Sequence, residues 1–347
     1  MPHRALDKAR DGRSQLRRAT QTLPQPGPAA EAFRRAAATA PPDTTRVRLL
    51  LRYVEALGGG DVTETGRASR EALALARTLG DRRGEAGALF GRAVSAMLAG
   101  DFADADADAD SAAHLARAVD DVRVLARSLT LRGNTAMRRG DLDAALAHYT
   151  AALAATDDSV TVAKIASNAA NVYERLGRLP EALVLYRRAL GIVRAARDSA
   201  SEALVLGNVG AVFTRIARNP GASGTGAASP VRAASAGARA PDRTAADSAL
   251  GYAWRELALA RALRDPSRIA RAEDHVGAAL AAAGRPGEAL APLARAAVGY
   301  TRLGQRAERL ANLRVAAEAN LALGHQAAAA AAARTAVALA DSLDAHE

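Results

Sequence analysis

The residues that look most like metal ligands form a run of four alternating aspartates: Asp104, Asp106, Asp108 and Asp110. A calcium-binding loop between two helices needs a glycine at its sixth position and a glutamate at its twelfth. Counted from Asp104, those positions hold Ala109 and Leu115. The run also falls at the start of a predicted helix, where carboxylates interact favourably with the helix dipole. We therefore expect a solvated acidic face and not a calcium site.

Other patterns that carry chemistry are isolated or missing. Four histidines stand alone, without the second histidine three or four residues away that a zinc site uses: His114, His148, His275 and His325. The sequence contains no Gly-x-x-x-x-Gly-Lys phosphate loop, no Gly-x-Ser-x-Gly turn and no His-Glu-x-x-His motif. Cysteine is absent, which excludes a disulfide framework and a cysteine nucleophile. We therefore expect a protein that is not an enzyme and uses no cofactor and no metal.

The elements that position these residues are predicted to be helices. Hydrophobic residues make up 49% of the 347 residues but only 3% are aromatic, and the apolar content is mostly Ala and Leu. These residues favour helices, whereas sheets favour β-branched and aromatic residues. The composition therefore predicts an all-α fold.

The net charge of +10 is concentrated in two segments. Residues 1–40 carry eight Lys or Arg against three Asp or Glu, and residues 218–246 carry four Arg against one Asp, which leaves +2 for the rest. A protein that follows nucleic-acid phosphates needs basic residues along the body of its fold. We therefore do not expect nucleic acid as the partner; such binding would depend on residues 1–27 and 218–246.

The sequence predicts a cytoplasmic protein without a membrane segment. Residues 1–30 include basic residues but no apolar core of a secretory signal. Residues 319–333 are the longest stretch without charged side chains, and they fall short of the roughly 20 apolar residues of a membrane span.

A turn signature recurs along the chain: an apolar helix, a glycine with a short polar step, and a second helix. The glycines, expected to be left-handed helix caps, are Gly60, Gly100, Gly140, Gly177, Gly284 and Gly324, at spacings of 40, 40, 37, 107 and 40 residues. Ala217 lies 40 residues after Gly177, so the long spacing contains one repeat with an insertion. The period predicts seven helical hairpins between residues 44 and 344, each stable only when stacked on its neighbours.

Small residues at fixed distances from these turns are expected to let the helices pack closely. The third hairpin shows the pattern best, with Gly133-Asn134, Gly140-Asp141-Leu142, Ala145-Leu146, Tyr149 and Ala152-Leu153. This pattern resembles the tetratricopeptide repeat family, in a form with a forty-residue period. The resemblance covers most of the chain and implies a right-handed α-solenoid whose first helices line a concave, ligand-binding groove.

In that family the second, fifth, ninth, twelfth and thirteenth residues of each repeat face the groove. Transferred to hairpins three to five, together with Asn208, the resemblance implies these binding residues: Arg127, Thr130, Asn134, Arg138, Lys164, Ser167, Asn171, Arg175, Asn208, Thr214 and Arg215. Arg138, Arg175 and Arg215 are equivalent and are expected to form a ladder, which favours an acidic peptide because guanidinium groups pair with carboxylates. The alternative is that these arginines only interact with helix C-termini.

Two hairpins depart from the pattern. In the first, Tyr53 and Thr65 occupy positions expected to be small, so its register stays open. In the fifth, Glu256 replaces a buried alanine. Either that helix is rotated so that Tyr252 or Trp254 packs in its place, or the insertion loosens the repeat.

The remaining segments are interpreted from composition. Residues 1–28 are expected to be a flexible basic arm, and residues 29–40 to form a short helix that caps a solenoid over residues 29–347. Residues 218–246, rich in Gly, Ala, Ser and Pro, are expected to be a disordered insertion. Residues 326–343 form an Ala-rich last helix where solenoids usually end on a polar one. We expect that end to dock a second copy or an effector, unless so weakly apolar a surface needs no cover.

These expectations describe a non-catalytic scaffold that binds a protein or an extended acidic peptide in the groove of a solenoid. The alternative is a sensor or regulatory module of a bacterial signalling system, which responds to a peptide or small ligand and acts on a separate effector.

Overall fold

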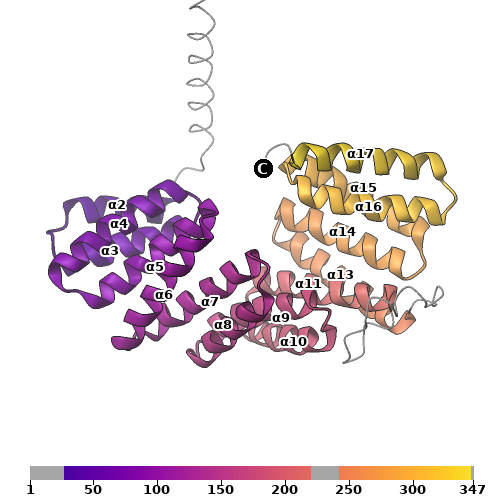
Figure 1. Ribbon diagram of the computed structural model, residues 1–347. Helices are drawn as coiled ribbons and strands as arrows, with labels where there is room; N and C mark the ends of the chain where they lie inside the picture. Colours follow the sequence, from indigo (N-terminus) through magenta and orange to yellow (C-terminus); the bar gives the residue numbers. More distant parts are fainter. Residues whose placement is uncertain (1–26, 220–241, 345–347) are drawn as a thin grey trace, which may run out of the picture. The chain divides into compact units, whose positions relative to one another are not determined.

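The computed structural model describes residues 27–219 and 242–344, which form fifteen helices and no strand (Figure 1). The prediction of an all-α fold is confirmed. The chain divides into two compact units, unit 1 up to Thr156 and unit 2 from Asp157 onwards.

Unit 1 is a stack of antiparallel helices in which each helix packs on the next along the chain. Its described helices are α2 (Pro28–Thr39), α3 (Thr44–Leu57), α4 (Val62–Leu79), α5 (Arg82–Ala99), α6 (Phe102–Ala118), α7 (Val122–Arg138) and α8 (Leu142–Ala154). Helices α3/α4, α5/α6 and α7/α8 are the first three predicted hairpins, and α2 is the predicted capping helix, packed on α3. The first helices α3, α5 and α7 also contact one another in order.

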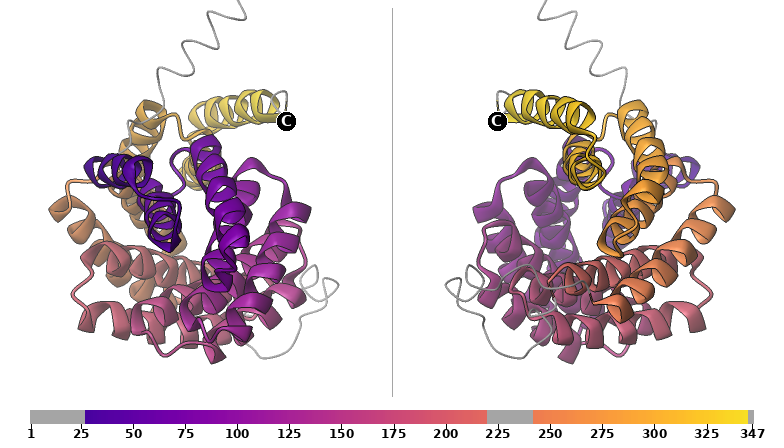
Figure 2. Two further views of the ribbon diagram at one scale, coloured as in Figure 1. Left: turned by 90° about the vertical axis from the view of Figure 1, so that its left-hand side faces the viewer. Right: turned by 90° about the vertical axis from the view of Figure 1, so that its right-hand side faces the viewer.

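Unit 2 has the same construction. Its described helices are α9 (Ser159–Arg175), α10 (Leu179–Ala195), α11 (Ser199–Arg218), α13 (Arg243–Ala262), α14 (Pro266–Ala282), α15 (Pro286–Leu303), α16 (Arg306–Ala322) and α17 (Gln326–Asp344). They form the other four predicted hairpins, and the antiparallel course of the helices within each hairpin can be followed in Figure 2.

Local sequence explains where most helices begin and end. Aspartate side chains accept backbone N–H groups at the start of nine helices, at Asp43, Asp61, Asp81, Asp121, Asp141, Asp158, Asp198, Asp242 and Asp265. Five of the predicted turn glycines are left-handed, with φ between 72° and 88°: Gly100, Gly140, Gly177, Gly284 and Gly324. Glycine adopts this backbone conformation without the steric cost that a Cβ atom brings.

The first turn differs from the prediction. Gly58 and Gly59 are the left-handed residues, with φ of 58° and 80°, and Gly60 is not. The prediction for Gly60 is wrong because two extra residues separate α3 from the cap of α4. Tyr53 and Thr65 are both buried, and the Tyr53 hydroxyl donates to Glu64 at 2.9 Å, so large residues are accommodated in this hairpin.

Small residues do pack at the helix interfaces as predicted. Ala145 and Ala182 are fully buried, and a Cβ atom on Gly133 would lie 2.5 Å from the ring of the buried Tyr149. In this part of the chain the glycine is therefore required by the close approach of two helices.

The fifth hairpin is neither rotated nor loosened. Glu256 is completely buried at the position where other repeats have alanine, Tyr252 stacks on Phe213 with ring centroids 5.7 Å apart, and Trp254 is 48% exposed. The carboxylate fits because Gly207 faces it: a Cβ atom there would lie 2.5 Å from Glu256 Oε1.

The predicted arm and insertion fall largely outside the described residues, which exclude 1–26 and 220–241. The two ends of the predicted insertion are helical, however. Arg218 belongs to α11, and α13 begins at Arg243 with Ala245 and Ala246 buried. The prediction of disorder is therefore wrong at these ends.

Within residues 27–219 and 242–344, no helix combines the length and apolar content needed to span a bilayer.

Candidate functional site

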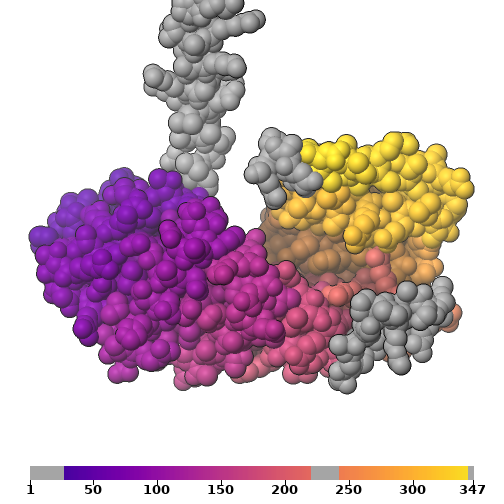
Figure 3. Space-filling model, viewed as in Figure 1, coloured from indigo at the N-terminus to yellow at the C-terminus, as the bar shows by residue number. Residues whose placement is uncertain are grey.

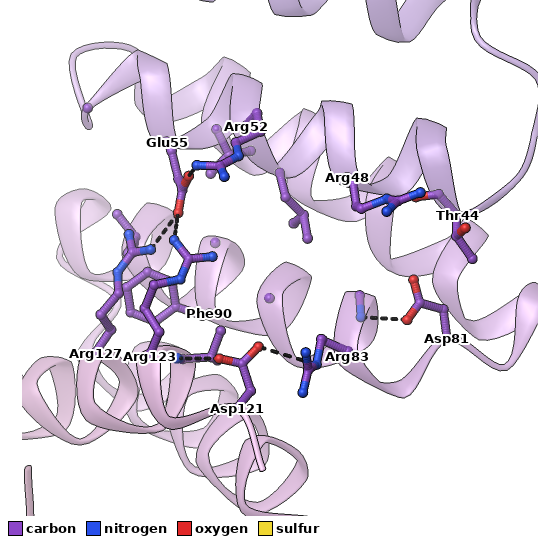
Figure 4. Close-up of a pocket in the computed structure, with 18 of the residues that line it drawn as sticks. Thr44, Arg48, Arg52, Glu55, Asp81, Arg83, Phe90, Asp121, Arg123 and Arg127 are labelled. Atoms are coloured by element: carbon purple, nitrogen blue, oxygen red, sulfur yellow. Dashed lines mark hydrogen bonds and ion pairs between the residues drawn. The ribbon is translucent and has the colours of Figure 1, made fainter. Parts of the chain in front are cut away.

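A cavity of about 770 Å³ opens in unit 1 between the first helices of its three hairpins (Figure 4). Its polar lining comes from all three helices and the turns before α5 and α7: Thr44, Arg48, Arg52, Glu55, Asp81, Arg83, Asp121, Arg123 and Arg127. The volume lies within the range of about 300–1,000 Å³ that is usual for ligand sites in proteins. We refer to this cavity as the unit 1 pocket.

Three glycines of α5 line the floor of the unit 1 pocket. They are Gly84, Gly87 and Gly91, with Phe90 and Val94 between and beyond them. At Gly87 a Cβ atom would lie 2.8 Å from Leu51 Cδ1, so a side chain there would have to displace the end of Leu51, which also lines the pocket. Glycine in a helix interior is destabilising by roughly 0.5–1 kcal/mol relative to alanine. The close packing of Leu51 against α5 is thus obtained at a cost to helix stability.

The rim of the pocket is rich in arginine. Asp81 and Asp121 cap helices by accepting the N–H groups of Gly84 and Val124, at 2.9 and 3.0 Å. Arg83 lies 3.7 Å from Asp121, and Arg48 has no ion pair within the described residues. Cationic groups therefore remain available to a ligand at this end of the pocket.

At the other end a single carboxylate holds three guanidinium groups. Glu55 accepts from Arg52 at 3.2 Å and from Arg123 and Arg127 at 2.7 Å each, and Figure 4 shows this cluster at the opposite end from Arg48. The Arg127 guanidinium also lies 4.4 Å above the ring of Phe90. Partial burial opposes ionisation of Glu55, but hydrogen bonds and charges from Arg127 and Arg123 outweigh it and lower its pKa.

Among the predicted binding residues of unit 1, the structure brings Arg127 into the pocket. The side-chain oxygen of Asn134 accepts a hydrogen bond from Tyr149 at 2.6 Å, and the Thr130 hydroxyl donates to the Ala126 carbonyl at 2.7 Å. Arg138 is exposed. Asn134 and Thr130 therefore have structural partners, which the sequence pattern alone did not reveal.

In unit 2, Lys164 and Ser167 line a smaller cavity of about 100 Å³ between α9, α10 and α11. The other predicted residues there have varied surroundings. Asn171 accepts from Tyr186, Thr214 donates to its own helix at 2.9 Å, and Arg215 donates to the Glu174 carbonyl at 2.8 Å. Arg175 is exposed and Asn208 is half-buried. A ladder of Arg138, Arg175 and Arg215 stays a prediction, because Arg138 belongs to unit 1 and the other two to unit 2.

Three of the four aspartates of the acidic run of α6 pair with arginines, while Asp104 and Asp110 are exposed. Arg132 donates to Asp106 at 2.9 Å and also to Asp110, and Arg92 lies 3.0 Å from Asp108. Across the residues described, no group of three His, Asp or Glu is arranged to hold a metal ion. The predicted acidic face is thus partly solvated and partly engaged in ion pairs with neighbouring helices.

Unit 2 contains buried ion pairs of a different kind. Glu256 accepts from Arg271 at 3.2 Å and contacts His275 Nδ1 at 2.7 Å, and Glu273, also buried, accepts from Arg261 and Arg295 at 2.8 and 2.7 Å. Burial disfavours the charged form of His275, but the charge and hydrogen bond of Glu256 outweigh this and raise its pKa. Burial raises the pKa of the neighbouring Asp274, whose Oδ1 accepts from Asn312 at 2.7 Å.

Helix α17, drawn in yellow in Figure 3, lies at the surface of unit 2 and leaves apolar residues exposed. Val337 is 61% exposed, whereas Ala329 packs inwards. The predicted apolar surface is present, and docking of a second copy or an effector on it stays a prediction.

The sequence matches no protein-family model, and no curated protein matches it. Solved structures do resemble the fold. The apo form of the quorum sensor NprR from B. thuringiensis has 14% identity and a TM-score of 0.62, over 89% of this chain and 80% of that one. Aspartyl phosphate phosphatase F from Bacillus subtilis has 11% identity and a TM-score of 0.61, over 84% of this chain and 70% of that one. A Rap protein complexed with competence and sporulation factor has 14% identity and a TM-score of 0.58, over 86% of this chain and 77% of that one.

The chain therefore has a tetratricopeptide-like helical-repeat fold. The predicted resemblance is confirmed at the level of the fold.

The position of the first turn explains why the sequence did not predict the unit 1 pocket. Counted from Gly58, the true turn glycine, Arg48, Arg52 and Glu55 precede the turn by ten, six and three residues. Those are the groove-facing fifth, ninth and twelfth positions. Counted from Gly60, as predicted, the same positions would hold other residues. In α5 the groove-facing positions hold Gly87, Phe90 and Val94, which all line the pocket.

Proposed function

We propose that this protein is a non-catalytic binding protein whose unit 1 pocket holds an extended, acidic segment of a peptide or protein. One observation carries the proposal: the groove-facing residues of three successive first helices line a single cavity with a glycine-containing floor and an arginine rim. Apolar side chains beside the glycines, Leu51, Phe90 and Val94, can pack against the ligand. Guanidinium groups bind carboxylates through paired, charge-assisted hydrogen bonds.

The chemistry of the lining supports binding over catalysis. Most of its ionisable groups are arginines, which stay protonated and act neither as acids nor as bases. Asp81 and Asp121 cap helices. The pKa of Glu55 is lowered, whereas a general acid or base works best with a pKa near the operating pH.

A filling substitution tests the site. Gly87→Leu places a side chain on the pocket floor, and Gly251→Leu makes the same change at an exposed position of α13 where nothing lies within 4 Å. Both replace glycine in a helix interior, which favours the helix, but the side chain at position 87 must also displace Leu51 Cδ1. We expect peptides selected from a displayed random library on the wild type to be rich in Asp and Glu. They should bind Gly251→Leu normally and lose binding to Gly87→Leu.

The same library distinguishes the pocket from the predicted arginine ladder. The triple variant Arg138→Glu, Arg175→Glu and Arg215→Glu leaves every residue of the unit 1 pocket intact. If the pocket is the site, the selected peptides keep most of their affinity for this variant. Equal binding to Gly87→Leu and the wild type, with loss in the triple variant, would assign the site to the ladder instead.

The likeness to a quorum sensor and to a Rap protein complexed with competence and sporulation factor supports a second function, that of a peptide-responsive regulator. A regulator must pass the binding event to another surface. The single tryptophan, Trp254, lies in unit 2 and is 48% exposed, so its fluorescence reports on a unit without the pocket. A change in Trp254 emission when a selected peptide binds unit 1 would favour the regulator. An unchanged emission would favour a passive scaffold.

A further inference from the structure

Glu55 lies in an unfavourable part of its helix. It belongs to the last turn of α3, which ends at Leu57. The carbonyl end of a helix carries partial negative charge and disfavours a carboxylate. The three arginines around Glu55 therefore stabilise its carboxylate at this position. Two of them, Arg123 and Arg127, come from α7.

Glu55 also differs from the other carboxylates of the pocket. Asp81 and Asp121 are fixed by the helices that they cap, whereas the Glu55 side chain interacts, among the residues that the structure describes, with pocket arginines alone. It is 26% exposed, so it can leave the cluster for solvent. The Arg127 guanidinium would stay in place, because it rests on the Phe90 ring as well.

We propose that Glu55 is an internal competitor that occupies the place of a ligand carboxylate on Arg123 and Arg127. An acidic ligand must displace it, so Glu55 sets how strongly and how selectively the pocket binds. The inference rests on the proposed function, since it assigns a role within that same pocket. It predicts that removing Glu55 improves binding, whereas removing a residue that contacts the ligand favourably would weaken binding.

Glu55 is ionised at neutral pH, so it competes with a ligand carboxylate there. Burial opposes ionisation of Glu55, but the hydrogen bonds and charges of Arg127 and Arg123 outweigh it and lower its pKa. A second carboxylate brought to the same guanidinium groups would therefore meet a like charge a few ångströms away. Neutralising Glu55 removes that repulsion and frees the donors.

The test compares two substitutions that change the net charge equally. Glu55→Gln keeps the size of the side chain and removes its charge. Glu85→Gln makes the same change to a glutamate outside the pocket, whose carboxylate lies 2.7 Å from the Arg77 guanidinium. The probes are fluorescein-labelled peptides of alternating Glu and Gly, and of alternating Gln and Gly, with binding followed by fluorescence anisotropy. We expect Glu55→Gln to bind the Glu peptide about tenfold more tightly than the wild type, the size of one charged hydrogen bond. Glu85→Gln should match the wild type, and the Gln peptide should show no gain.

Each other outcome has a definite meaning. If the Glu peptide binds the wild type and fails to bind Gly87→Leu, but Glu55→Gln gives no gain, the proposed function stands and the inference is wrong. If Glu55→Gln and Glu85→Gln gain equally, net charge explains the effect and the inference is again wrong. If the peptide binds neither the wild type nor Glu55→Gln, both the acidic-ligand proposal and the inference are wrong. Glu55→Ala, which favours the helix, must show the same gain, so poor folding of one variant cannot decide the result.

Discussion

Units 1 and 2 both bring arginine and glutamate together between helices of different hairpins, but with opposite exposure. In unit 1, Glu55 lies at the edge of an open pocket, and its partner Arg123 is 61% exposed. In unit 2, Glu256 is fully buried in its hairpin behind Gly207. An ion pair at an open edge can exchange one partner for another, whereas a buried one must keep its partners or leave a charge without solvent. The same chemistry therefore suits recognition in one unit and structural specificity in the other.

The largest difference is expected when each central glutamate is removed. Glu256→Ala restores the alanine of the other repeats but leaves Arg271 and His275 without their partner, and should cost about 3 kcal/mol of unfolding free energy. Glu55→Ala should cost less than about 1 kcal/mol, as partly exposed pairs do. Urea unfolding measures both, with Trp254 fluorescence for unit 2 and circular dichroism for the whole chain. Equal costs would break the comparison.

The pH dependence of stability should also separate the units. The folded-state pKa of His275 is raised, so its ion pair contributes fully below the ordinary histidine pKa and is lost as pH rises through the raised value. The groups facing it are Glu256 of α13, Arg271 and Asp274 of α14, and Glu174 of α9. Burial raises the pKa of Asp274 too, so its ionisation also lowers the stability of the folded state as pH rises.

Unit 2, followed by Trp254 fluorescence during thermal unfolding, should therefore lose stability as pH rises above neutral. His275→Gln should flatten this dependence. If the wild type and His275→Gln show the same dependence, the pair with Glu256 does not control it.

A smaller effect, equal in the two units, is expected at the buried tyrosines. Tyr149 donates to Asn134 in unit 1, and Tyr186 donates to Asn171 in unit 2. Tyr149→Phe and Tyr186→Phe should each cost about 1 kcal/mol, the usual net value of a hydrogen bond. If either substitution instead abolished peptide binding and left stability unchanged, its asparagine would belong to the ligand site, as the sequence predicted.

The smallest effects are expected at three left-handed residues in turns between hairpins. Asp120, Arg197 and Arg264 each have φ of 53°. Arg197→Gly and Arg264→Gly in unit 2 should raise stability by about 0.5 kcal/mol, because glycine has no Cβ to clash in this conformation. Asp120→Gly in unit 1 should gain less, since aspartate tolerates the left-handed region better. Melting temperatures by circular dichroism would show whether this order holds.

The fold could be predicted because its causes are local and repeated. Five turn glycines, the capping aspartates and the small residues at helix interfaces all recur in register. The pocket could not be predicted in full, since two extra residues before α4 shift the register of α3 and hide Arg48, Arg52 and Glu55. Arg127 was found because its own repeat has no such shift.

The buried network of unit 2 was beyond sequence reasoning for another reason. Glu256 is acceptable only because Gly207 lies opposite it and His275 comes from the next hairpin. Those positions are 49 and 19 residues away in the sequence. A pattern that describes one repeat at a time cannot join them.

The central claim is that the unit 1 pocket is the ligand site. Hydrogen–deuterium exchange, with and without the peptide of alternating Glu and Gly, tests it most directly because it needs no substitution. We predict slower amide exchange in α3, α5 and α7 when the peptide is present, and loss of that protection in Gly87→Leu. Protection confined to helices of unit 2, with none in α3, α5 and α7, would contradict the claim.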